Sequence, residues 1–273
     1  MPDQKIAVYM LSHLNVPAPP STSYIYPLQS GSDYKPRWDY YLCDNEGENI
    51  SKGHPWYSDV TGLYWVWKNA NAPIVGLFHY RRFLSPVNFP EKWNTAADVS
   101  KEIASNLLGY DPSGNVFVGD LSIADIIMAP PIWFGPIVEF WAKSNGSERD
   151  WNLMVSVIEQ LYPGEGEQLT AYFAEPRLTR LWSIFIARRQ ILSDYCDWLF
   201  PIFLQLELLI PERDRGLRIF ACMNEWLINY FVYSRRLNVV ARSAIFVTSN
   251  KTDVSPGFRT TPDSDPGFLQ FSK

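Results

Sequence analysis

The residues best suited to chemistry stand together at positions 79–82, in the order His-Tyr-Arg-Arg. They follow residues 74–78, a short apolar run that is typical of a fully buried strand. Open α/β sheets bind ligands outside the carboxyl ends of such strands. A histidine beside two arginines at that place can neutralise a diphosphate through bidentate hydrogen bonds. A structural salt-bridge cluster around a core histidine is the alternative, and spacing alone favours both interpretations equally.

Which of these side chains lie on the same face depends on whether the backbone stays extended through residues 79–82. An extended strand would place His79 and Arg81 on one face. Tyr80 and Arg82 would then share the other face, so only one arginine would reach the phosphates directly. The second arginine would brace the preceding loop through a carboxylate. The candidates for that carboxylate are Asp44, Glu48 and Asp59.

Residues 217–233 predict a buried helix, because they are apolar nearly all round. The residues that share one stripe of it are Arg218, Cys222, Glu225 and Asn229. A buried carboxylate is costly unless it is paired or used in chemistry, so Glu225 is the candidate general base. Burial would raise its pKa, and Arg218 would lower it. A structural ion pair between these two residues is the alternative, and the next candidates for the base are Asp59 and Asp125.

Further elements must position these groups. Residues 5–12 are rich in β-forming side chains and predict a first strand that is followed by His13. A proline-rich surface loop is expected over residues 15–27. Ser58 is a good N-cap for a short aromatic helix, and Asp59 at the first helical position suits the helix dipole.

The rest of the chain alternates between patterns typical of helices and patterns typical of strands. It predicts helices over residues 97–108, 152–162 and 192–210. It predicts strands over residues 116–118, 124–130, 181–186 and 239–247. This favours one α/β domain over residues 1–248, followed by a polar tail at 249–273.

Composition excludes several classes of protein. A chain of 273 residues, 47% hydrophobic and 19% charged, can bury a sizeable core. The formal net charge of -5 argues against a nucleic-acid partner. Three scattered cysteines indicate neither a disulfide framework nor a zinc site. The first apolar run is too short for a signal peptide and no run of about 18 apolar residues follows, so we expect a cytoplasmic protein without a transmembrane segment.

No other catalytic motif competes with these candidates. The sequence has no G-x-S-x-G or Walker motif, and its three histidines lack metal-ligand spacing. Its Asp-x-Asp, at Asp263 and Asp265, is better explained by a turn. Fixed cations can stabilise a departing diphosphate in place of a divalent metal. We therefore expect neither a metal nor a cofactor.

Several of these motifs resemble those of a bacterial family long labelled a domain of unknown function. They are Asn-Ile-Ser at 49–51, Asp-Val-Thr-Gly-Leu-Tyr-Trp-Val-Trp-Lys-Asn at 59–69 and His-Tyr-Arg-Arg at 79–82. The family is found in capsule and O-antigen loci, and some members are galactofuranosyltransferases. The resemblance covers roughly residues 6–247. As in the family, an arginine (Arg218) stands seven residues before a glutamate (Glu225). This chain departs from the family at the next position, where Trp226 replaces the usual arginine.

The resemblance implies an abbreviated GT-A-like, Rossmann-like glycosyltransferase fold with a helical acceptor half. It implies transfer of galactofuranose from UDP-galactofuranose, with inversion to a β-linked product, onto a lipid-linked bacterial surface glycan. Such a protein could associate peripherally with the inner face of the membrane. Asp59 and Arg218 would support the site. The residues that would bind the nucleotide-sugar are His13, Gln29, Asn49, His79, Arg81 and Arg82.

Two alternatives stay open at this point. One is a transferase for a UDP-pyranose sugar such as galactose or glucose. The other is a non-catalytic module that binds a glycan or a nucleotide, in which Glu225 could be replaced without loss of function.

Overall fold

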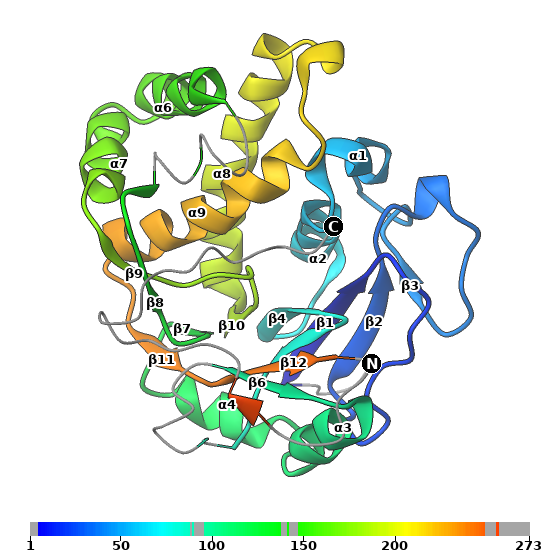
Figure 1. Cartoon of the computed structure of the whole chain (residues 1–273). Helices are drawn as coiled ribbons and strands as arrows, with labels where there is room; N and C mark the ends of the chain where they lie inside the picture. Colours follow the sequence, from blue (N-terminus) through cyan, green and yellow to red (C-terminus); the bar gives the residue numbers. More distant parts are fainter. Residues whose placement is uncertain are drawn as a thin grey trace.

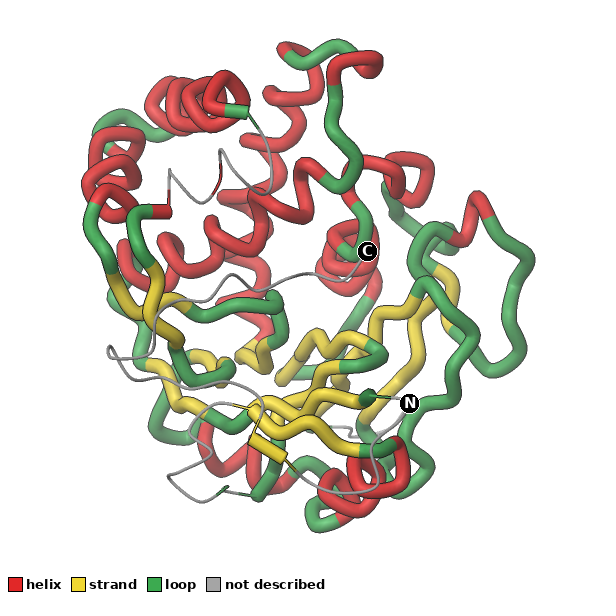
Figure 2. The backbone as a smooth tube through the Cα atoms, in the orientation of Figure 1, coloured by secondary structure: helices red, strands yellow, loops and turns green. Residues whose placement is uncertain are grey.

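The computed structural model is a mixed α/β structure, with its strands together in the lower half of Figure 1 and most helices above them. Figure 2 shows the same division between strands and helices. In the part of the chain that is described, buried side chains from strands and helices join in a continuous hydrophobic core. The described residues are 5–87, 89, 96–137, 141, 147–248 and 255–256.

Four parallel strands form the half of the sheet that carries the His-Tyr-Arg-Arg motif. They are β1 (Ile6–Ser12), β2 (Ile25–Gln29), β3 (Leu42–Cys43) and β4 (Ile74–His79). β1 lies between β2 and β4, and all 7 of its residues are buried. The chain runs outward from β1 to β3 and returns on the other side of β1 at β4. The strand order therefore reverses between β1 and β4.

Beyond β4 the sheet branches. One branch consists of β10 (Phe185–Arg188), β7 (Ile126–Met128) and β11 (Val239–Ala241). The other consists of β5 (Arg82–Leu84), β12 (Ala244–Val247), β6 (Ala96–Val99) and β13 (Ser255–Pro256). β10 is antiparallel to both β4 and β7, so β4 and β7 run in the same direction. A separate two-stranded ribbon pairs β8 (Ile132–Phe134) with β9 (Arg177–Thr179).

Helices lie on both sides of the strands in Figure 1. Above them are α1 (His54–Tyr57), α2 (Val60–Asn69), α6 (Glu148–Leu161), α7 (Glu165–Ala174), α8 (Arg189–Leu209) and α9 (Ile219–Ser234). Below them are α3 (Lys101–Gly109) and α4 (Asn115–Asp120). Short 3-10 helices occur at Ser32–Tyr34, Ser51–Gly53 and Glu212–Asp214. α2, α8 and α9 contact one another, and α8 also contacts β4 and β10, so these three helices bury their apolar faces over the middle of the sheet.

The strongly patterned elements are confirmed. The predicted strands at 5–12, 74–78 and 124–130 correspond to β1, β4 and β7. The predicted helices at 152–162, 192–210 and 217–233 correspond to α6, α8 and α9.

The weakly patterned segments were predicted only in part, and residues 116–118 were predicted wrongly. The helix expected over 97–108 begins as β6, and α3 starts only after Ser100, whose hydroxyl accepts the N–H of Ile103. Residues 116–118 lie in α4, and residues 239–247 divide into β11 and β12. The strand expected over 181–186 begins only at Phe185, because Trp182 and Ser183 have left-handed φ angles of 77° and 48°.

The predicted proline-rich loop ends in β2, which includes Pro27. β3 pairs with β2 only at Leu28 and Gln29, so Pro27 lies where the outer edge of the strand is unpaired. Of the predicted tail, only Ser255 and Pro256 belong to the described residues, and they pair with β6 as β13. The domain boundary at residue 248 stays a prediction.

Candidate functional site

A pocket of about 380 Å³ opens at the carboxyl edge of β1, β2 and β4, where the strand order reverses. His13 follows β1, Ser30 follows β2 and His79 ends β4, and all three line the pocket. Residues from α1 and from the segment that leads into α9 complete the lining, among them His54 and Arg218. This is the crevice in which open α/β sheets bind their ligands.

The His-Tyr-Arg-Arg motif forms a tight hairpin. His79 closes β4 and pairs with Arg82, the first residue of β5, so Tyr80 and Arg81 make the turn. β5 pairs antiparallel with β12, and the N–H of Val247 donates to the carbonyl of Arg81 over 2.9 Å. The prediction that the two arginines alternate across an extended strand is therefore wrong. Both Arg81 and Arg82 line the pocket.

The pocket concentrates positive charge in a protein whose formal net charge is -5. Among the described residues, its lining includes Lys35, Arg81, Arg82 and Arg218, and a single carboxylate, Asp59. Within the described part of the chain, none of these four cations belongs to an ion pair. Cations without anionic partners in a strand-end crevice suit an anionic ligand such as a diphosphate.

All three histidines of the chain, His13, His54 and His79, line this pocket. Burial lowers the pKa of each ring. For His79, burial together with the charges of Arg82 and Arg81 lowers the pKa to about 2. The N–H of Arg81 donates to Nδ1 of His79 over 3.3 Å, as a neutral ring allows. At neutral pH these histidines therefore offer hydrogen-bonding groups without charge.

Asp44 fixes the loop that follows β2. Its buried carboxylate accepts the N–H groups of Gly31 and Ser32 over 2.8 and 2.9 Å. It also accepts the hydroxyls of Ser51 and Thr61 over 2.7 and 2.6 Å. The carboxylate therefore connects the loop after β2 to α2, and it does not brace an arginine as one prediction allowed.

Replacing Asp44 with alanine is expected to lower the free energy of unfolding by about 2–6 kcal/mol, since two backbone N–H groups lose their acceptor and each unpaired buried donor costs about 1–3 kcal/mol. Urea unfolding of the purified variant measures this change. Asp44→Asn keeps one acceptor oxygen and should lose less stability than Asp44→Ala. Equal stability of the wild type and the alanine variant would show that the loop does not depend on this carboxylate.

Asp59 is the carboxylate that lines the pocket together with the cations. The prediction that Ser58 caps α2 is wrong: Ser58 ends α1 with φ 50°, Asp59 is the residue before α2, and neither side chain makes a capping hydrogen bond. Burial raises the pKa of the Asp59 carboxyl, while Arg218 and then Arg82 lower it. A pocket-lining carboxylate of this kind can accept a proton from a bound hydroxyl.

Glu225 is not among the residues that line the pocket. Its Oε1 accepts the backbone N–H of Trp182 over 2.6 Å. Burial raises its pKa, that hydrogen bond and Arg82 lower it, and Asp59 raises it. No ion pair joins it to Arg218 among the described residues, so the predicted structural pair is absent.

Several residues beside Asp59 and Glu225 have strained, left-handed backbone conformations. Ser58, Arg218, Trp182 and Ser183 are non-glycine residues with φ angles of 50°, 61°, 77° and 48°. Ser58 and Arg218 line the pocket, and Trp182 donates to Glu225. Such conformations are uncommon and tend to occur at functional sites.

Two residues that were predicted to bind the nucleotide-sugar lie outside the pocket lining. The buried amide of Gln29 donates to the carbonyl of Pro36 over 3.0 Å and accepts the N–H of Trp38 over 3.1 Å. The side chain of Asn49 donates to the carbonyls of Asn45 and Gly47 over 3.1 and 2.9 Å. Both side chains hold loops, so the structure gives them a supporting position.

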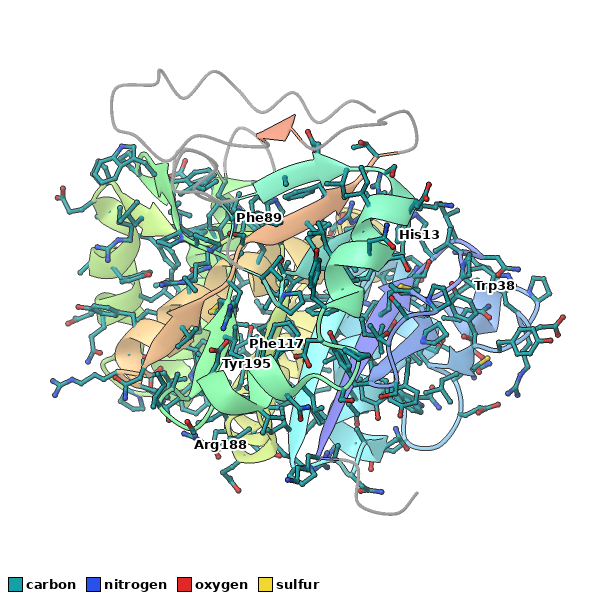
Figure 3. All side chains as sticks on the ribbon, turned by 90° about the horizontal axis from the view of Figure 1, so that it is seen from below. His13, Trp38, Phe89, Phe117, Arg188 and Tyr195 are labelled. Atoms are coloured by element: carbon teal, nitrogen blue, oxygen red, sulfur yellow. The ribbon has the colours of Figure 1, made fainter. Side chains whose placement is uncertain are left out.

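The other two candidate carboxylates also lie away from the arginines of the pocket. Glu48 accepts the hydroxyl of Tyr64 over 2.9 Å and pairs with Lys68 over 3.3 Å. Asp125 forms an ion pair with Arg188 just before β7, at the sheet edge opposite to the pocket. In Figure 3 Arg188 lies well apart from His13.

Sequence reasoning missed Lys35 and His54, which line the pocket. Lys35 lies in a loop whose local sequence carries no ligand motif. His54 could have been noticed, because it lies between the Asn-Ile-Ser motif and α2. The positions of both follow from how Asp44 and α1 close the loop against β1.

The described residues lack two further features. They contain no group of three or more His, Cys, Asp or Glu side chains arranged to hold a metal ion. They also contain no helix that is both long and apolar enough to cross a bilayer.

The chain is similar to a family of sequences and to a solved structure. The family model described as "Domain of unknown function (DUF4422)" matches residues 7–236. The chain belongs to this family. No curated protein matches the chain. A solved structure, "WbbM bifunctional glycosytransferase apo structure", matches with TM-score 0.73 and 23% identity.

That match covers 89% of this chain and 45% of the WbbM chain, so the protein spans less than half of the solved structure that it resembles. At this level of identity the likeness establishes the fold. The predicted α/β glycosyltransferase fold of this DUF4422 chain is confirmed.

Proposed function

We propose that the protein is a glycosyltransferase that moves a sugar from a nucleotide-diphosphate donor to a glycan acceptor. The observation that carries the proposal is the cationic pocket at the strand-order reversal of a glycosyltransferase fold. There Arg81, Arg82 and Arg218 have no ion-pair partner among the described residues. A donor diphosphate would supply the missing negative charge, and the same arginines would stabilise it as it departs.

In this proposal the acceptor hydroxyl attacks the anomeric carbon of the donor sugar. The new carbon–oxygen bond forms as the bond to the diphosphate oxygen breaks, and the hydroxyl proton passes to a carboxylate. Such a direct displacement inverts the anomeric carbon, so an α-linked donor would give a β-linked product.

We assign the base to Asp59, because it lines the pocket and Glu225, the candidate from sequence, does not. Glu225 then has a positioning role. It accepts the N–H of Trp182, and its charge favours the protonated form of Arg82.

We further propose UDP-galactofuranose as the donor and a lipid-linked bacterial surface glycan as the acceptor, with transfer at the cytoplasmic face of the membrane. The support is the resemblance of the motifs at 49–51, 59–69 and 79–82 to those of galactofuranosyltransferases. The purified protein would be incubated with UDP-galactofuranose, UDP-galactose or UDP-glucose and with extracted lipid-linked glycan. UDP release and the mass of the glycan product would be measured.

Transfer from UDP-galactofuranose alone is the expected result. Transfer only from UDP-galactose or UDP-glucose would move the assignment to the pyranose donors. UDP binding without transfer from any donor would favour a non-catalytic module.

UDP is expected to bind with the same affinity in EDTA as in Mn²⁺, because fixed cations of the pocket would serve the electrostatic purpose of a metal. Isothermal titration of the protein with UDP under both conditions measures this directly. Loss of binding in EDTA and its return with Mn²⁺ would show that a divalent cation is required.

A further inference from the structure

The wall of the pocket formed by the loop after β2 and by α1 contains two polar atoms that lack hydrogen-bond partners in the described part of the chain. Ser30 is 2% exposed, and its hydroxyl has no hydrogen-bond partner among the described residues. Nδ1 of His54 is likewise buried and has no such partner there. Both residues line the pocket. Since buried polar atoms in folded proteins are nearly always hydrogen-bonded, two exceptions in one pocket indicate that a ligand supplies the partners.

The backbone fixes both groups in place. The N–H of Ser30 donates to the carbonyl of Ser12 over 2.9 Å, and the next N–H, of Gly31, donates to Asp44 over 2.8 Å. Gly31 has φ 71°, and a Cβ there would lie 2.6 Å from the ring of His54. The close approach of this glycine to the imidazole therefore sets the positions of Ser30 and His54 together.

The chemistry of this wall differs from that of the arginine wall. A serine hydroxyl both donates and accepts, and a neutral imidazole has one donor and one acceptor nitrogen. Burial lowers the pKa of His54, so the ring is neutral near pH 7. Neutral groups that both donate and accept match the hydroxyls of a sugar, whereas phosphate oxygens match the arginines.

We propose that Ser30 and His54 form a hydroxyl-binding subsite for the ligand that the arginines hold by its diphosphate. The inference rests on the proposed function, because it takes the ligand to be a nucleotide-sugar. Two parts of such a ligand carry suitable hydroxyls, the ribose and the transferred sugar. The diphosphate joins the two, so the subsite can serve either one while the arginines hold the phosphates.

Ser30→Ala removes the hydroxyl without filling the pocket, and titration with four probes tests the subsite. The probes are UDP, 2′-deoxyuridine diphosphate, UDP-galactofuranose and inorganic diphosphate. If the ribose is bound, the variant should bind UDP about 2- to 10-fold more weakly, the usual value of one hydrogen bond. It should also lose the wild-type preference for UDP over the deoxy compound. If the transferred sugar is bound, only the affinity for UDP-galactofuranose should fall.

Inorganic diphosphate should bind the wild type and the variant equally, because it contacts the arginine wall alone. Ser32→Ala is the matched control, since its hydroxyl donates to the carbonyl of Gln29 over 3.0 Å and it does not line the pocket. His54→Phe should repeat the effect of Ser30→Ala on the same probes. Equal affinities of wild type and Ser30→Ala for UDP and UDP-galactofuranose would overturn the subsite alone. Failure of the wild type to bind any nucleotide probe would overturn the proposed function, and the subsite with it.

Discussion

Replacing Asp59 with asparagine is expected to lower turnover by roughly 10²–10⁴-fold, the usual contribution of a general base. Asparagine has nearly the same size but cannot accept the proton of the acceptor hydroxyl. UDP affinity and melting temperature should change little, because the amide oxygen of asparagine can still accept the backbone N–H of residue 59, as the Asp59 carboxylate does. Initial rates at saturating donor, together with UDP titration, measure the two effects separately.

The pH dependence gives a second readout of the same residue. A base works in its deprotonated form, so turnover should fall as the pH drops through the pKa of the Asp59 carboxyl. Burial raises that pKa from 3.8, so the acid limb should have its midpoint above that value. The residual activity of Asp59→Asn should lack this limb.

Glu225→Gln is the matched comparison, because the amide oxygen can still accept the N–H of Trp182. We expect it to keep much more activity than Asp59→Asn. If Glu225→Gln lost turnover while Asp59→Asn stayed active, the base would be Glu225, as the sequence alone suggested.

Arg82→Ala is expected to weaken UDP binding roughly 10- to 150-fold, which corresponds to about 1.5–3 kcal/mol for a charged hydrogen bond. Arg81→Ala should have an effect of similar size, because the hairpin brings both side chains to the pocket. The variants should differ in stability. Arg82 is half-buried and lies in the field of Glu225 and Asp59, whereas Arg81 is exposed. Titration with UDP and thermal unfolding of both variants check these expectations.

Lys5→Ala is the control for a general loss of charge. Lys5 is exposed just before β1, at the sheet edge opposite to the pocket, and it also carries one positive charge. Its removal should leave UDP affinity unchanged. Binding that weakened equally in Lys5→Ala and Arg81→Ala would mean that the arginines act only through the net charge of the protein.

The sequence by itself determined the elements whose burial is nearly complete. β1, β4 and α9 appear where apolar runs at 5–12, 74–78 and 217–233 predicted them. A run of this kind specifies its own burial, because exposing it to water would cost free energy at every residue. The same local pattern placed His79 at the end of a strand, and with it the expectation of an anion site at the carboxyl edge of the sheet.

Only the tertiary structure decided how the side chains of the site face one another. The turn at Tyr80 and Arg81 depends on pairing between β5 and β12, a strand more than a hundred residues later in the chain. The loop with Ser30 takes its shape from the carboxylate of Asp44, and Trp182 reaches Glu225 through a left-handed backbone. These arrangements result from contacts between distant segments, which compete with local preference and are not visible in the periodicity of any one segment.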